Sequence, residues 1–436
     1  MLSILGFLTI IVFTILVMLR KMQAFTAIIF VPIVFAVIGG FGSQIGEFAA
    51  EGILLVSDTA VLLLFAILYF GIMMESGLFD PVSNAILKIA KGDPVKICMG
   101  AAILAILVAL DGDGTTTYMI VCSAMLPVFR KLGINPLILA TLAIMALGIV
   151  AGSTPWGGSA TRAISVLGLD ASEYFLPMLP IMAGGIIWTL ITAFILGRME
   201  RKRLGLTNEQ LRQEVKTQEE TASTAQNAVQ ARKWVIYFNL FLTLALMALL
   251  IADIIELYIL FIIGFAIALV VNYPNLQKQR EVMKEHAANA IPVVSLVLAA
   301  GIFTGILQGT HMVDSMAEDI VSVLPENFGS FYTVFIALIG LPLSWLMSND
   351  AYFFGALPVL AEAGNVYGVA PIEVARASVI GQTIHLIGPT SAPLWVLIEL
   401  VRTDLGKLQK FAIIWIILSA LVMILFGLLF GGISIG

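Results

Sequence analysis

Long apolar stretches recur along almost the whole chain and are separated by short polar or basic segments. A helix that crosses a bilayer needs roughly 20 apolar residues. Ten stretches meet that length or approach it: 2–19, 24–41, 59–77, 137–152 (continuing past a break to about 168), 175–197, 234–252, 256–272, 289–310, 371–402 and 411–432. Two more, 95–130 and 328–362, carry polar residues at their centres and predict helical hairpins. This pattern predicts an all-α polytopic membrane protein.

Composition supports the same class. The 436 residues are 60% hydrophobic and 12% charged, and soluble domains carry about twice that charged fraction. Arg20 and Lys21 follow the first apolar stretch rather than preceding it, which predicts a transmembrane helix and not a secretory signal. Cys98 and Cys122 both lie in apolar sequence and predict two buried thiols without a disulfide.

The basic residues predict the topology. Lysines and arginines cluster near 20–21, 88–96, 130–131, 198–233, 278–284 and 402–410. With the N-terminus outside, all of these clusters fall on one side, which the positive-inside rule assigns to the cytoplasm. Loops on the opposite side then carry acidic residues such as Glu47, Glu51, Asp314 and Glu318. We therefore expect a multi-pass protein of the bacterial cytoplasmic membrane with both termini outside.

This threading makes the two hairpins re-entrant from opposite faces. Residues 95–130 have basic residues at both ends, whereas 328–362 are flanked by Glu326 and Glu362. Each half then holds five transmembrane helices and one re-entrant hairpin, with 1–197 and 234–436 joined by a cytoplasmic linker at 198–233. Such an inverted repeat is a common plan of secondary transporters. Short paired motifs recur in the same order in both halves, for example Leu126-Pro127-Val128 and Leu357-Pro358-Val359.

The hairpin turns carry the first candidate chemistry. One turn reads Asp111-Gly112-Asp113-Gly114-Thr115 and the other Ser348-Asn349-Asp350. A charge at membrane depth costs roughly 2.5–3.5 kcal/mol on insertion scales, so carboxylates there favour a functional role. We predict a cation or proton site at these aspartates, with helix N-capping as the structural alternative. A calcium loop is excluded, because its twelfth position would be Cys122 instead of glutamate.

Two predicted spans are broken by proline and glycine, at 152–159 and 388–393. Proline lacks a donor, and irregular backbone at membrane depth is tolerated only where protein buries it or water reaches it. Broken helices present free N–H groups and a positive dipole end, which suit an anion. The structural alternative is a pair of proline kinks without a ligand. We thus predict broken helices over 137–168 and 371–402.

Other polar residues lie near these segments. Arg162 follows the first break and is a candidate partner for a substrate carboxylate, with an external position or an internal salt bridge as alternatives. His385 lies near the second break and is a candidate proton relay, against a hydrogen-bonded core histidine. Arg376 follows Glu373 at a helical ion-pair spacing and predicts a structural role. His286 is placed in a cytoplasmic loop.

The predicted site combines these positions. Its substrate-binding residues are Gly114, Thr115, Thr116, Ser153, Thr154, Gly157, Arg162, Ser348, Asn349, Thr390 and Ser391. Its metal or proton residues are Asp111, Asp113, Asp350 and His385.

The chain resembles the divalent-metal–citrate:proton symporter (CitMHS) family of the ion transporter superfamily over essentially its full length. The residues that carry the resemblance are Met1–Gly6, Leu110–Tyr118, Gly152–Gly158, Ser348–Tyr352 and Gly388–Ser391. The resemblance implies a homodimer with a scaffold and a mobile transport domain that works by an elevator motion. Related dicarboxylate carriers have Ser-Asn-Thr at both tips. This chain departs from that pattern, with Asp-Gly-Thr at Asp113–Thr115 and Ser-Asn-Asp at Ser348–Asp350. The difference disfavours sodium coupling and favours a metal-bearing substrate that is carried with protons.

We expect a symporter that imports citrate complexed with a divalent metal such as magnesium or calcium, with protons as the coupling ion. The alternatives are a proton- or sodium-coupled carrier of a metal-free di- or tricarboxylate, and a channel. No nucleophile motif, cysteine–histidine cluster or phosphate-binding loop occurs in the sequence. We therefore expect no enzyme activity, no cofactor and no nucleic-acid partner.

Overall fold

The structure is a computed structural model that describes residues 1–78, 81, 86, 92–205, 233–252, 254–323 and 326–434. Within these ranges every regular element is a helix. The predicted linker at 198–233 lies largely outside the described residues, although the helix before it continues to Arg203.

The first half begins with α1 (Leu2–Met18), α2 (Ala24–Ile38), α3 (Ile45–Leu55) and α4 (Ser57–Glu75). The first hairpin follows as α6 (Pro94–Val108), η1 (Ala109–Asp111) and α7 (Gly114–Lys131). The half ends with α8 (Pro136–Ala146), η2 (Leu147–Ala151), α9 (Gly158–Leu167) and α10 (Ala171–Arg203).

The second half has a similar order of elements. It begins with α12 (Lys233–Ala252), α13 (Leu257–Asn272), α14 (Leu276–Gly309) and α15 (Met312–Val323). The second hairpin is formed by η3 (Glu326–Phe331), α16 (Tyr332–Leu346), η4 (Ala351–Ala356) and α17 (Leu357–Val366). The half ends with α18 (Pro371–Gly381), η5 (Gln382–Ile387), α19 (Ala392–Val401) and α20 (Leu405–Leu429).

Apolar helices long enough to cross a bilayer dominate the described residues. Six have the length and composition of a membrane span, and a seventh is obtained when α18, η5 and α19 count as one bent span. Five shorter apolar helices, including α1, α2 and α13, accompany them. Large apolar side chains such as Ile11, Ile15 and Phe241 are exposed, as expected of a surface that faces lipid. The protein is therefore a multi-pass membrane protein.

Irregular backbone occurs at the turns and breaks that glycine and proline predict. Gly112 separates η1 from α7 and has φ of +84°, a conformation that glycine adopts at little cost. Between α8 and α9 the chain passes through the π-helical turn η2 and residues 152–157. In the second half η5 is a 3₁₀ helix, and the chain bends by 42° before α19.

Three helical features differ from the sequence prediction. Helices α3 and α15 have no counterpart among the predicted spans, and α14 begins at Leu276 instead of 289. Glu47 and Glu51 therefore lie on α3, and Asp314 and Glu318 on α15, where loops were predicted. The physical reason is the placement of charges. Helices α3 and α15 are amphipathic, with charges on one face, and the first turns of α14 are charged, so a search for uniformly apolar stretches excludes these segments.

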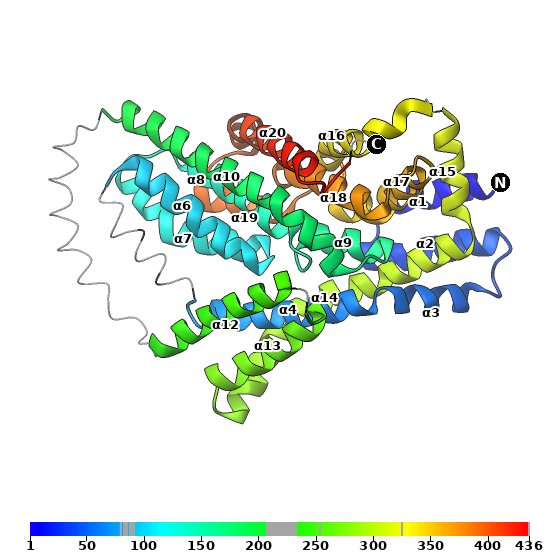
Figure 1. The fold of residues 1–436 in the computed structure, drawn as a ribbon, viewed down its shortest axis with the longest axis horizontal. Coiled ribbons are helices and arrows are strands. Elements are labelled where there is room, and N and C mark those ends of the chain that lie inside the picture. Colours follow the sequence, from blue (N-terminus) through cyan, green and yellow to red (C-terminus); the bar gives the residue numbers. More distant parts are fainter. Residues whose placement is uncertain are drawn as a thin grey trace.

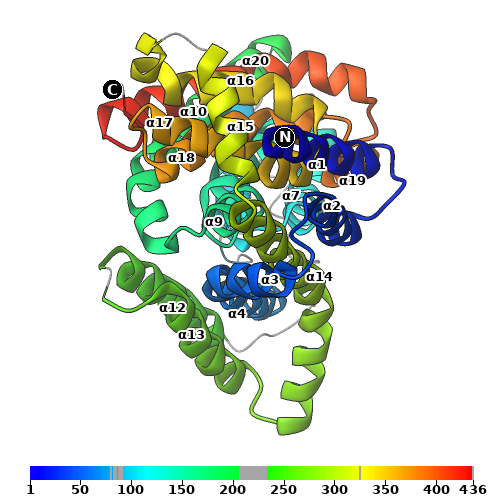
Figure 2. The same ribbon diagram turned by 90° about the vertical axis from the view of Figure 1, so that its right-hand side faces the viewer.

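The helices form two groups, which Figures 1 and 2 show from two directions. In the lower group α14 packs against α2, α3 and α4, and α13 packs against α4 and α12. In the upper group α10 packs against α6 and α20, α19 packs against α7, and both α16 and α17 pack against α18. Helix α9 contacts both α14 and α18, and so lies between the groups.

Glycines allow α3 and α14 to cross at backbone contact. A Cβ atom on Gly52 would lie 2.0 Å from the carbonyl oxygen of Gly301, and one on Gly305 would lie 2.1 Å from that of Phe48. Small residues at such a crossing let two helices approach closely in a membrane, where close packing is a main source of association. The α3–α14 crossing therefore depends on the absence of side chains at these positions.

We predict that Gly52→Ala destabilises the protein by about 1–3 kcal/mol, because the added methyl group overpacks the crossing. The measurement is the thermal unfolding midpoint in detergent. Gly46→Ala is the matched control on the same helix, since a Cβ there meets nothing within 4 Å. Equal midpoints for the two variants would contradict the crossing.

Candidate functional site

A cavity of about 950 Å³ lies where the two hairpin turns and the two helix breaks meet. Helices α4 and α14 line it from the other side. From the turns and breaks the lining includes Asp111, Gly112, Asp113, Gly114, Thr115, Thr116, Gly152, Trp156, Gly158, Ser159, Thr161, Arg162, Ser348, Asn349, Asp350, Gln382, His385, Thr390, Ser391, Ala392 and Pro393. Four segments that are distant in the sequence thus share one cavity.

The first turn presents two carboxylates. Asp113 is the N-cap of α7, and its Oδ2 accepts a hydrogen bond of 2.6 Å from the backbone N–H of Thr116. Asp113 therefore caps a helix, as the structural alternative predicted, and it also lines the cavity. Asp111 ends η1, and its carboxylate accepts no hydrogen bond from the residues that the structure describes.

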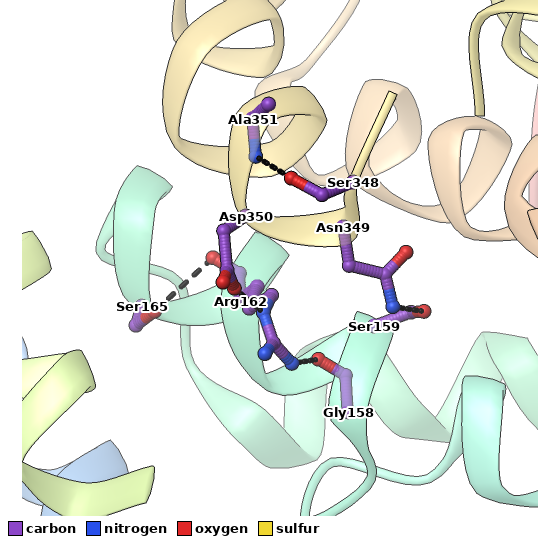
Figure 3. A network of polar contacts seen from close by, with 8 residues as sticks. All are labelled: Gly158, Ser159, Arg162, Ser165, Ser348, Asn349, Asp350 and Ala351. Atoms are coloured by element: carbon purple, nitrogen blue, oxygen red, sulfur yellow. Dashed lines mark hydrogen bonds and ion pairs between the residues drawn. The ribbon is translucent and has the colours of Figure 1, made fainter. Parts of the chain in front are cut away.

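The second turn is tied to helix α9 of the first half (Figure 3). The Arg162 Nε atom lies 2.7 Å from Asp350 Oδ1, and each side chain is 21% exposed. Asn349 Nδ2 lies 3.5 Å from Ser159 Oγ, and Arg162 Nη1 donates to the carbonyl oxygen of Gly158. Arg162 thus forms the internal salt bridge that was one of the predicted alternatives. This salt bridge lies at the cavity and joins the two halves of the chain.

The first break is held against the first turn. Trp156 Nε1 donates a hydrogen bond of 2.8 Å to the carbonyl oxygen of Leu110. Gly157 is required for this sharp turn, because a Cβ there would lie 1.6 Å from the carbonyl oxygen of Ala151. Trp156 also stacks on Phe70 of α4 with ring centroids 5.7 Å apart. These contacts hold the break against the first turn and against α4.

The second break completes the arrangement. Thr390 Oγ1 donates to the carbonyl oxygen of Met347 beside the second turn, at 3.2 Å. On its other side Pro393 packs so closely on the first turn that a Cβ on Gly114 would lie 2.9 Å from Pro393 Cγ. Each turn thus contacts both breaks, and the four segments form a closed ring. We call this arrangement the polar ring.

The polar ring offers groups for both signs of charge. The first residues of α7, α9 and α19 line the cavity, so three positive helix ends lie at its wall. Asp111, Asp113 and Asp350 contribute carboxyl groups, and Arg162 contributes a guanidinium group that is paired with Asp350. Within the described chain, no three His, Cys, Asp or Glu side chains are grouped to hold a metal ion.

Not every predicted site residue reaches the cavity. Ser153 and Thr154 are fully buried, and neither they nor Gly157 belongs to its lining. His385 lines the cavity, and its Nδ1 lies 3.0 Å from the carbonyl oxygen of Ser344. The other predicted residues, from Asp111 to Ser391, lie at the cavity wall.

Arg376 is structural, as the sequence predicts, but its partners are different. Its guanidinium donates to the backbone carbonyls of Glu173, Tyr174 and Gly432. Glu373 instead accepts hydrogen bonds from the backbone and side chain of Ser434. Helical spacing alone therefore predicted the wrong partner for the arginine.

The sequence prediction missed one side of the cavity. Glu75 of α4 and Glu285, His286 and Asn289 of α14 contribute to the lining. The placement of His286 in a loop is wrong, because α14 continues through it, and its Nε2 lies 3.4 Å from Glu75 Oε2. Charged residues near the start of α14 concealed the helix. Gln382 was also missed, since an isolated amide in apolar sequence gives no pattern.

A helical membrane protein whose two broken helices and two hairpin turns enclose a polar cavity has the architecture of many membrane transporters. Comparison with known proteins agrees. The sequence model of the citrate transporter family (CitMHS) matches residues 1–381, and the chain belongs to this family.

Three curated proteins of Bacillus subtilis (strain 168) are similar to this chain, and each match covers the whole length of both sequences. They are the "Uncharacterized transporter YraO" at 49% identity, a "Citrate transporter" at 46% and a "Mg(2+)/citrate complex secondary transporter" at 47%. The Alcanivorax borkumensis YdaH transporter resembles it in structure, with a TM-score of 0.54 over 90% of this chain and 88% of that one. At 13% identity this likeness concerns the fold alone.

We predict that Arg162 and Asp350 are energetically coupled. Arg162→Gln and Asp350→Asn should each lower the thermal unfolding midpoint, and the double variant should lose less than the sum of the two. The expected coupling is about 0.5–3 kcal/mol, as for contacting charged residues. The exposed pair Lys278 and Glu281, 3.8 Å apart, is the control and should give nearly additive effects. Additive losses for Arg162 and Asp350 would contradict the coupling.

Proposed function

We propose that the protein is a secondary active transporter, and not an enzyme, that imports citrate complexed with a divalent metal ion by proton symport. The observation that carries this proposal is the polar ring, where carboxylates share one cavity with three helix N-termini and Arg162. A bare polyanion would meet the carboxylates unfavourably. A complex in which metal accompanies the anion provides a partner for each sign of charge.

In this proposal the protein and citrate share the coordination of the metal. Magnesium usually keeps several waters and binds one or two protein carboxylates together with substrate oxygens. Asp111 and Asp113 lie two residues apart on one turn and can supply such a pair. Citrate then fills most of the remaining positions. Calcium accepts the same oxygen ligands, so the residues do not select one of the two metals.

The anion is assigned to the rest of the ring. Helix N-termini at α9 and α19 provide backbone N–H groups, and the hydroxyls of Thr115 and Ser348 provide further donors. Asp350 and His385 are candidates for the coupled proton, because both line the cavity and both can change charge. This division leaves Arg162 to be shared between Asp350 and a substrate carboxylate.

We further propose an inverted repeat that works by an elevator motion within a homodimer. The similar order of elements in the two halves supports the repeat, and the two helix groups supply a possible scaffold and a possible mobile part. The basic residues of the sequence support a bacterial cytoplasmic membrane with both termini outside. The alternative is a carrier of metal-free di- or tricarboxylate.

The proposal predicts metal-dependent and proton-driven accumulation of citrate. In right-side-out vesicles, labelled citrate should accumulate with magnesium or calcium present and an inward proton gradient. Chelation of the metal or a protonophore should abolish accumulation. Undiminished uptake after chelation would favour the metal-free carrier, and equilibration without accumulation would favour a channel.

Asp113→Asn should lower metal-citrate uptake by at least about 10-fold, which corresponds to about 1.4 kcal/mol of lost binding. Asparagine caps a helix as well as aspartate does, so the variant removes charge and keeps the cap. Asp404→Asn is the matched control, because Asp404 caps α20 in the same way and lies outside the cavity lining. Equal uptake by both variants would refute the role of Asp113.

A further inference from the structure

Gln382 is a buried residue of the cavity lining whose amide has no hydrogen-bond partner among the residues that the structure describes. It is 4% exposed, and its Nε2 and Oε1 atoms are both buried and unpaired within the described ranges of the chain. Buried polar groups are almost always hydrogen-bonded, since each unpaired one costs a large part of its hydration. An amide whose donor and acceptor are both unpaired in the lining of a cavity is therefore a candidate for binding a ligand there.

The backbone around Gln382 is held in place. Ser344 Oγ donates to the carbonyl oxygen of Gly381 at 3.0 Å, and His385 Nδ1 lies 3.0 Å from the carbonyl oxygen of Ser344. Gly381 packs against Gly340 of α16 so closely that its Cβ would lie 2.8 Å from the Gly340 Cα. Rigid elements of this kind position a binding group with little entropy left to lose.

We propose that Gln382 determines specificity by binding the hydroxyl group of the substrate. The inference rests on the proposed function, and it adds which residue recognises the hydroxyl group of the substrate. A neutral amide suits a neutral group, whereas the charged groups of the substrate are met elsewhere on the ring. The Oε1 atom accepts the hydroxyl proton, even when the hydroxyl oxygen binds the metal. The Nε2 atom donates to a carboxylate oxygen on the same carbon.

The proposal has a direct chemical probe. Tricarballylate is citrate without the hydroxyl group, and it keeps all three carboxylates. A site built to bind a hydroxyl discriminates strongly against the analogue that lacks it, because its buried polar atoms then stay unpaired. Replacing the amide by an apolar side chain of similar length removes that cost. The preference for citrate over tricarballylate should then fall, because the two substrates differ only in the hydroxyl group.

The experiment measures kcat/KM for citrate and for tricarballylate in vesicles at one fixed magnesium concentration, with wild type and Gln382→Met. The wild-type preference for citrate should fall by at least about 10-fold in the variant, mainly through slower citrate uptake. Tricarballylate and citrate bind magnesium differently in solution. This difference cancels when the same ratio is compared between wild type and variant.

Thr383→Val is the matched control in the same 3₁₀ turn. Thr383 is equally buried, its hydroxyl bonds the carbonyl oxygen of Ile380, and it does not line the cavity. This variant should change the uptake of both substrates alike. If Gln382→Met does not accumulate, Gln382→Asn replaces it, because the shorter side chain withdraws the amide and predicts the same fall in preference.

The outcomes separate this inference from the proposed function. A wild-type protein that carries neither substrate contradicts the proposed function. A wild type that carries citrate, with a Gln382→Met variant whose preference is unchanged, overturns only the inference. An equal loss of both substrates also overturns it, since a purely structural amide would act in that way.

Discussion

The structure depends on one constraint: backbone that leaves the helix at membrane depth must be satisfied by other parts of the protein or by water. Four segments leave the regular helix at this depth: two are hairpin turns and two are helix breaks. Their polar backbone groups are satisfied largely because the four segments contact one another. Trp156 bonds Leu110, and Thr390 bonds the carbonyl of Met347, so each break supports the turn of its own half. Arg162 with Asp350, and Gly114 with Pro393, then close the ring between halves.

The same constraint explains why the polar residues are concentrated. Irregular backbone needs a polar environment, and carboxylates at membrane depth need one as well. A single cavity provides it for both, and the apolar helices around it can then face lipid. The π-helical turn η2 and the 3₁₀ helix η5 lie beside the breaks, where the helical pattern gives way. Regular helices would not bring side chains from four segments to one wall.

Sequence alone predicted the place of these segments along the chain, because glycine, proline and aspartate are conspicuous in apolar sequence. It did not predict which face of each segment points inward. Ser153 and Thr154 lie behind the wall, while Ser159 and Thr161 line it, and this difference depends on the course of the break in space. His286 was missed for another reason: the first turns of α14 are charged, so the helix was predicted to begin later. The family was recognisable from the combination of turns and breaks.

The ion pair across the ring also bears on which substrate the cavity favours. Arg162 is already neutralised by Asp350, so an anion that binds the arginine must compete with an internal carboxylate. Asp111 and Asp113 lie on the opposite turn and add repulsion for any bare polyanion. A bound cation offsets the second effect, because it attracts the first-turn carboxylates and lowers the charge of the anion. In the proposed function, the anion with a metal therefore suits this cavity better than the same anion alone.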